Sequence, residues 1–216
     1  MRAVRRIRYR RKPVRFRRRR YARRRVHRRR TTKLSVKLTR TIVMDVDGKA
    51  ENNLSLHANL NEFSEHINLG ANFERVKVWK VRARVYPQQN VANNTTSRIG
   101  NYCIVPYHNV MPATAINFPT ALSIDKAKVF RGTQVGRMSF VPVSRLDVDK
   151  RNTGAPAPSY TCTTWRPTFE ISSTASEQWL YCGMIVPERL IDQNAPSHFT
   201  IIIDVFVTYY NQRSFL

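Results

Sequence analysis

The first thirty residues most constrain how this chain can fold, because they hold 18 lysines and arginines and no aspartate or glutamate. Like charges at this density repel one another, and the segment has too little apolar surface to offset the entropy lost on ordering. We therefore expect residues 1–31 to form a disordered arm and residues 32–216 to form one folded domain. The remainder of the chain carries 20 basic and 14 acidic side chains, so its net charge is only +6 of the total +24.

The arm has the composition of a nucleic-acid ligand. Arginine outnumbers lysine in it by 17 to 1, and Tyr9, Phe16 and Tyr21 are interleaved with the cations. Guanidinium groups match phosphate geometry, and both arginine and aromatic rings stack on bases. Such an arm reads phosphates and therefore binds without base-sequence specificity. Its dense clusters are also typical of nuclear import signals, which bind import receptors. The predicted nucleic-acid-binding and nuclear-localisation residues are Arg2, Arg5, Arg6, Arg8, Arg10, Arg11, Lys12, Arg15, Arg17, Arg18, Arg19, Arg20, Arg23, Arg24, Arg25, Arg28, Arg29 and Arg30.

Beyond the arm, the hydrophobic pattern has the period of β-strands. Apolar and polar side chains alternate over residues 33–46, as in a half-buried strand. In the segment 73–86 the apolar parity changes near Trp79 and Lys80, which predicts a one-residue β-bulge there. Further strands are expected at 101–106, 160–171, 178–186 and 198–210, one or two more at 128–143, and a short helix or turn near 63–67. Strands separated by long loops predict an all-β sandwich or barrel.

The sequence carries no strong catalytic, cofactor or metal-binding motif. Phosphate-binding glycine loops and zinc-protease motifs are absent, and the five histidines are scattered. Three cysteines without a C-x-x-C spacing argue against a disulfide framework and a zinc site. Two D-x-D pairs, beginning at Asp45 and Asp147, could bind a divalent cation, although solvated strand ends are the more common case. We predict no catalytic residue, no metal and no cofactor.

Membrane insertion is not expected, because no apolar stretch approaches the length needed to span a bilayer and no secretory signal is recognisable. The three tryptophans Trp79, Trp165 and Trp179 lie in strand-like sequence. Core or interface packing is the expected role of their rings, and stacking on nucleic-acid bases is the alternative.

Several segments in this order resemble the capsid protein of the circovirus and cyclovirus group of small circular single-stranded DNA viruses. The arm RRIRYRRKPVRFRRRRYARRRVHRRR has the texture of the family's arm, and KLSVKLTRTIVMDV stands where its first strand follows. The most specific likeness is LNEFSEHI followed by NFERVKVWKVRARVYP. KVFRGTQVGRMSFVPVSR and HFTIIIDVFVTYYNQ resemble a later strand and the closing strand.

The resemblance implies a single eight-stranded jelly roll built from two four-stranded sheets. It also implies an icosahedral T=1 shell of sixty copies, packaging of the single-stranded DNA genome, entry into the host nucleus, and attachment to sulfated glycans at the cell surface. Sixty arms would carry about a thousand positive charges, on the order of one kilobase of single-stranded phosphate. Lys33, Lys37 and Arg40, which follow the arm, could extend the basic inner surface of such a shell.

Two other functions remain compatible with the pattern. The first is a cellular or ribosomal-type nucleic-acid-binding protein with a basic tail, although such proteins usually spread cations over the folded part as well. The second is a nuclease with a basic tether, for which two isolated D-x-D pairs are a weak candidate site.

Overall fold

A computed structural model of the chain describes residues 33–46, 53–88, 100–112, 114–148, 160–171, 179–189 and 197–213. The predicted arm and the loop segments 89–99 and 151–159 lie outside the described residues. The proposed boundary at residue 31 therefore stays a prediction. None of the described helices is long and apolar enough to cross a membrane.

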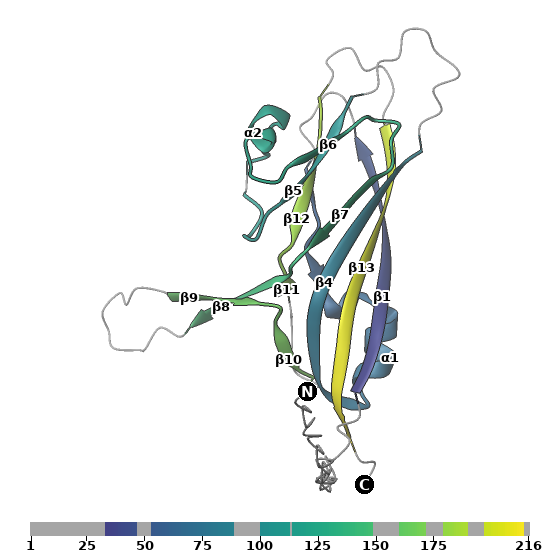
Figure 1. Ribbon diagram of the computed structural model, residues 1–216, viewed down its shortest axis with the longest axis vertical. Helices are drawn as coiled ribbons and strands as arrows, with labels where there is room; N and C mark the ends of the chain where they lie inside the picture. Colours follow the sequence, from purple (N-terminus) through teal and green to yellow (C-terminus); the bar gives the residue numbers. More distant parts are fainter. Residues whose placement is uncertain are drawn as a thin grey trace, which may run out of the picture. The chain divides into compact units, whose positions relative to one another are not determined.

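The first sheet is dominated by three long antiparallel strands that lie side by side (Figure 1). Its strand order is β1, β13, β4, and both β7 and β10 then pair with β4 along the same edge. The closing strand β13 is therefore central, with β1 and β4 on its two sides. The strands span β1 Lys33–Val46, β4 Phe73–Pro87, β7 Gly136–Phe140, β10 Thr168–Glu170 and β13 Ser197–Gln212.

The second sheet is shorter and antiparallel, in the order β2, β12, β5, β6. It consists of β2 Leu54–Ser55, β5 Tyr102–Pro106, β6 Lys128–Phe130 and β12 Gly183–Pro187. Along the chain, β1, β4, β7 and β13 enter the first sheet, and β2, β5, β6 and β12 enter the second. This alternation is the eight-stranded jelly roll, and the predicted all-β fold is confirmed.

The remaining elements are short connections around the two sheets. A two-stranded sheet joins β3 to β11, and a separate hairpin joins β8 to β9. Three short helical segments lie between strands. These elements span β3 Ala58–Asn59, η1 Leu60–Glu62, α1 Ser64–Gly70, α2 Phe118–Leu122, β8 Val143–Val148, β9 Tyr160–Trp165 and β11 Trp179–Leu180.

A bulge in β4 keeps its apolar side chains in the core. Lys80 pairs with Phe206 and Val78 pairs with Val207, so Trp79 is the extra residue. The parity change predicted from sequence is thus confirmed at Trp79. The core-facing residues on both sides of the bulge are completely buried: Val76, Val78, Val81, Ala83 and Val85.

Two features of the chain connections differ from the sequence-based expectation. The predicted strand 160–171 is split at Arg166, whose φ of 51° lies in the left-handed region and ends the strand. The helix α2 was not anticipated. Asn117 caps it by accepting a hydrogen bond from the Thr120 N–H, and its Ala121 packs in a second apolar cluster against β5 and β12.

The cysteines and tryptophans occupy contrasting places. Cys103 and Cys182 are buried free thiols, whereas Cys162 is exposed. All three tryptophans are at the surface, each at least 38% exposed, so core packing is the wrong interpretation for their rings.

Acid destabilisation is expected from His57, which lies in the connection between β2 and β3. The Nε2 atom of His57 is buried without a hydrogen-bond partner among the described residues, and the centroids of the His57 and Tyr181 rings are 4.6 Å apart in a T-shaped arrangement. Desolvation lowers the pKa of His57 from 6.5 to about 4. The unfolded chain therefore binds a proton more readily, and the free energy of unfolding should fall as pH drops from about 6.5 towards about 4. Urea unfolding across this range would measure the change. His57→Gln should reduce the slope of stability against pH without abolishing it, because burial also lowers the pKa of His66. An unchanged slope would contradict the assignment to His57.

Candidate nucleic-acid interface

One face of the first sheet packs on the core, and the opposite face, here called the open face, carries polar and charged side chains. The alternation is clearest in β13. Ile201, Ile203 and Val205 are completely buried in the core, whereas the even-numbered residues between them point the other way. Residues paired across antiparallel strands share a face, so the register identifies the neighbours of these residues on β1 and β4.

The open face is rich in cations drawn from three strands. On β1, Lys33 and Lys37 stand opposite Tyr210 and Phe206 of β13. On β4, the basic side chains Lys80, Arg82 and Arg84 follow the bulge at every second position. Arg84 pairs with Arg137 of β7, which adds a further cation to the same face. The cations of the open face are Lys33, Lys37, Arg75, Lys77, Lys80, Arg82, Arg84 and Arg137.

Aromatic rings lie among these cations. The Lys77 Nζ lies 4.2 Å from the centroid of the Trp79 ring, and the Lys33 Nζ lies 5.3 Å from that of Tyr210. The guanidinium carbon of Arg82 is 5.4 Å from the Phe206 centroid. Interleaved cations and aromatic rings are the surface on which single-stranded nucleic acids bind, because the cations meet phosphates and the rings stack on bases.

The β4 bulge places Trp79 at this face. Its indole Nε1–H donates a hydrogen bond to Thr208 Oγ1 at 3.0 Å, and Thr208 Oγ1 lies 3.0 Å from Ser35 Oγ. These contacts join β4, β13 and β1 through their side chains. The ring is 38% exposed, so its orientation is fixed while part of its surface stays open.

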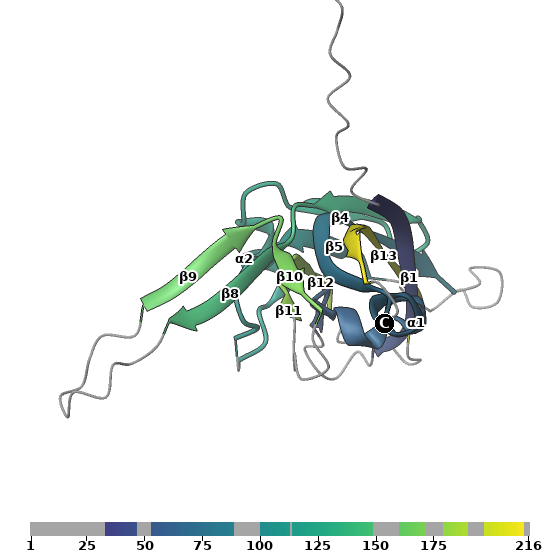
Figure 2. The ribbon, with the colours of Figure 1, turned by 90° about the horizontal axis from the view of Figure 1, so that it is seen from below.

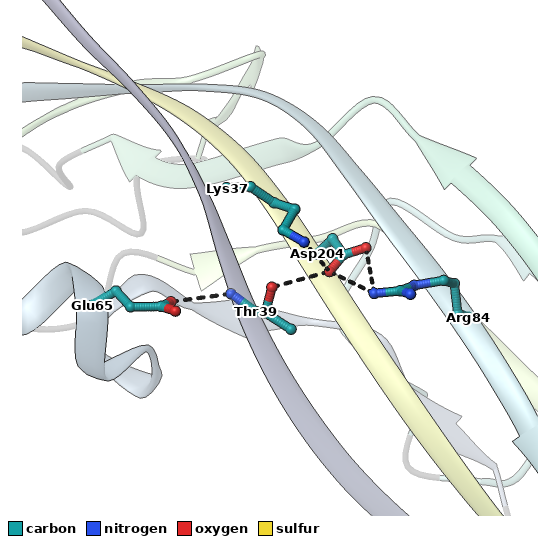
Figure 3. Close-up of polar contacts among 5 residues, drawn as sticks. All are labelled: Lys37, Thr39, Glu65, Arg84 and Asp204. Atoms are coloured by element: carbon teal, nitrogen blue, oxygen red, sulfur yellow. Dashed lines mark hydrogen bonds and ion pairs between the residues drawn. The ribbon is translucent and has the colours of Figure 1, made fainter.

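Among the residues that the structure describes, one carboxylate is buried, and it lies at the centre of the open face (Figure 3). The Asp204 side chain is only 3% exposed, and Arg84 Nη2 lies 2.9 Å from its Oδ2. Thr39 Oγ1 donates to Asp204 Oδ1 at 3.1 Å, and the Lys37 Nζ is 4.0 Å from the same oxygen. A carboxylate can be buried here because charged and hydroxyl donors replace its water. Asp204 thereby offsets the repulsion between cations of β1 and β4.

The edge strand β1 is also fastened to helix α1. Glu65 Oε2 accepts a hydrogen bond from the backbone N–H of Thr39 at 3.2 Å (Figure 3). The next residue of α1, His66, contacts β13, because its Nδ1 atom and the buried Tyr209 hydroxyl are 2.8 Å apart. Burial lowers the pKa of His66, which favours the neutral ring at this contact. The strand that follows the arm is therefore held from both sides.

The structure separates the predicted inner-surface residues. Lys33 and Lys37 share the open face, but Arg40 has the opposite parity on β1 and forms an ion pair with Glu62. The arm residues Arg2 to Arg30 lie outside the described residues. Of the D-x-D pairs, Asp45 binds His198 at 2.6 Å. Within the described ranges, no group of three or more histidine, cysteine or acidic side chains could hold a metal ion.

The basic residues of β4 and β7 were not singled out from sequence, although a signal for them exists. Lys80, Arg82 and Arg84 alternate with the buried Val81, Ala83 and Val85. Once the bulge at Trp79 is placed, this alternation puts all three cations on one face.

Comparisons with known proteins agree with the fold. A family model described as circovirus capsid protein matches residues 3–213. The capsid protein of Human associated cyclovirus 1 is 39% identical over 182 residues, which cover 83% of each chain. The solved 60-mer BFDV capsid protein superposes with a TM-score of 0.62 at 11% identity, covering 86% of this chain and 97% of that one. The Cocksfoot mottle virus structure gives a TM-score of 0.54 at 7% identity, over 85% and 97% of the chains.

Proposed function

Because this chain belongs to the circovirus capsid protein family, we propose that it assembles into a sixty-subunit T=1 icosahedral shell that packages a circular single-stranded DNA genome. The identity of 39% to a cyclovirus capsid protein supports the viral role. The 60-mer of the BFDV capsid protein, which has the same fold, supports the assembly. The virion is then where the mature protein is found.

In this shell the open face of the first sheet lines the interior and meets the genome together with the arm. The observation that carries this assignment is the continuity of charge along the chain. Arg30 ends the arm, and Lys33 begins β1 and already belongs to the open face. The arm neutralises phosphates by counterion release, and the open face adds fixed cations and the rings of Trp79, Phe206 and Tyr210.

Before assembly the arm directs the subunit to the host nucleus. The clusters Arg17 to Arg20, Arg23 to Arg25 and Arg28 to Arg30 are the segments that import receptors would bind. In the closed shell the same cations are occupied by DNA. One segment thus serves import first and packaging afterwards, and the two roles do not compete in time.

Assembly of the full-length chain is the experiment that tests this function. We expect the purified protein, with single-stranded DNA present, to form closed uniform particles of about sixty subunits by electron microscopy and analytical ultracentrifugation. A chain that stays monomeric across salt and pH with DNA present would contradict the shell. A nucleic-acid-binding protein that acts as a single subunit would then be the better interpretation.

A further inference from the structure

The hairpin of β8 and β9, here called the ribbon, extends away from both sheets. Figure 1 shows it leaving the sandwich between β7 and β10, and the perpendicular view of Figure 2 shows β8 and β9 extending away from the sheets. In the part of the chain that the structure describes, its strands pair with each other from Val143–Trp165 to Val148–Tyr160, and the one further pairing is a bridge between Val143 and Tyr181. An isolated two-stranded ribbon is marginally stable in water, so a projecting one needs further contacts.

The root of the ribbon is rigidly attached to the body. The Val143 and Tyr181 backbones exchange hydrogen bonds of 3.0 and 2.7 Å, and the Arg166 N–H donates to the Pro142 carbonyl at 2.9 Å. Arg166 has a φ of 51°, a left-handed conformation that is strained for a residue with a side chain. This turn directs the ribbon away from β4 before β10 rejoins the sheet. Its direction is therefore built into the fold.

The ribbon presents both of its faces to solvent along β9. Successive strand residues point to opposite faces, yet Cys162, Thr163, Thr164 and Trp165 are all exposed. Trp165 is 56% exposed, the largest exposure among the three tryptophans. One edge of its ring system contacts His108 at a centroid distance of 4.9 Å. A large aromatic ring held in place at a surface is typical of the centre of a protein interface.

An apolar groove of about 480 Å³ lies beside Trp165 at the root of the ribbon. Pro106, Ile124, Phe140 and Val141 contribute to its lining, and Asp125 lies at the same groove. Lys126 also lines the groove, and the ribbon strand β8 carries the cation Arg145. The patch is therefore apolar with both signs of charge, unlike the open face, where cations dominate. This composition fits a protein partner better than a nucleic acid.

We propose that the ribbon and the groove at its root form a contact between copies of this chain, in which the ribbon of one subunit docks on its neighbour. The inference rests on the proposed shell, which surrounds every subunit with further copies. A surface that carries a projecting aromatic, an apolar groove and charges of both signs can complement itself, as a two-fold contact requires. Docking covers β9 and so supplies the contacts that the isolated ribbon lacks.

Cys162 is a native probe for this contact. It is the exposed thiol, whereas burial raises the pKa of Cys103 to about 11 and raises that of Cys182, so these two resist alkylation. We expect iodoacetamide to modify Cys162 readily in the dissociated subunit and about tenfold or more slowly in the assembled shell, as mass spectrometry would measure. Equal rates in both states would overturn the proposal. Thr41→Cys in a Cys162→Ser background is the control for entry of the reagent into the shell, because Thr41 lies on the open face that lines the proposed interior. Modification of this cysteine in the assembled shell would show that slow labelling of Cys162 is not caused by exclusion of the reagent.

A second variant tests the contact without chemical labelling. Thr164→Arg places a long cation on the exposed strand β9 and should prevent particle formation while the subunit melts like the unmodified protein. The matched control is Thr41→Arg, the same change at an exposed strand position that is far from the ribbon in sequence and is not among the cations and rings assigned to the genome. This control should still assemble. Normal assembly of Thr164→Arg would refute the ribbon contact and leave the proposed function intact. Failure of the unmodified chain to assemble would count against both.

Discussion

Deleting residues 1–31 should remove most of the protein's affinity for single-stranded DNA and leave its fold intact. The deletion takes away 18 cations, whereas the jelly-roll core and the open face are formed by later residues. The logarithm of the binding constant falls with the logarithm of salt by about 0.7 per neutralised phosphate on single strands. We therefore expect an affinity loss of about a thousandfold or more near physiological salt, with a much flatter salt dependence. Fluorescence anisotropy with an oligonucleotide at several salt concentrations measures both quantities.

A variant of the open face provides the comparison for the arm deletion. Replacing Lys77, Lys80 and Arg82 by glutamine removes three cations without touching the arm, so the salt slope should fall by about 2. The same variant removes the two cations that lie over Trp79 and Phe206. An unchanged salt dependence of DNA binding after the arm deletion would mean that the arm does not bind the phosphates. An unchanged salt dependence in the glutamine variant would mean that the open face does not bind the phosphates.

The fold could be predicted from sequence where hydrophobic period and burial coincide. The alternation in β1, the parity change in β4 and the long closing strand β13 are all read correctly, because each strand has one face in the core. The helix α2 was missed because five residues are too short to show a helical period. The break at Arg166 was missed because a left-handed arginine has no sequence signature and is imposed by the surrounding chain.

The candidate site was only partly predictable for a related reason. Lys33, Lys37 and Arg40 were grouped by their closeness to the arm, but strand parity puts Arg40 on the other face, beside Glu62. The cations of β4 come together with those of β1 only through β13, which lies more than a hundred residues later in the chain. The role of Asp204 depends on the same pairing. Its sequence neighbours are apolar, and its partners Arg84, Thr39 and Lys37 come from two other strands.

Replacing Asp204 by asparagine should lower stability and raise DNA affinity at the same time. Asparagine keeps the size of the side chain but removes the charge that pairs with Arg84 at 2.9 Å. Both cations that contact Asp204 remain partly solvated, so the expected loss in free energy of unfolding is about 1–3 kcal/mol. One fewer negative charge on the open face should strengthen single-stranded DNA binding by about three- to fourfold near physiological salt. Urea unfolding and anisotropy titration measure the two effects separately.

Asp45→Asn is the matched control, because it makes the same chemical change on the same face. The Asp45 side chain is 64% exposed and pairs with His198 at the far end of β1, so its loss should change stability by about 0.5 kcal/mol or less. Opposite changes in stability and affinity for Asp204→Asn alone would show that the carboxylate holds the sheet together against its own cations. A loss of affinity with the loss of stability would instead mean that Asp204 orients Arg84 for phosphate binding. The sign of the affinity change therefore decides whether Asp204 limits DNA binding or organises it.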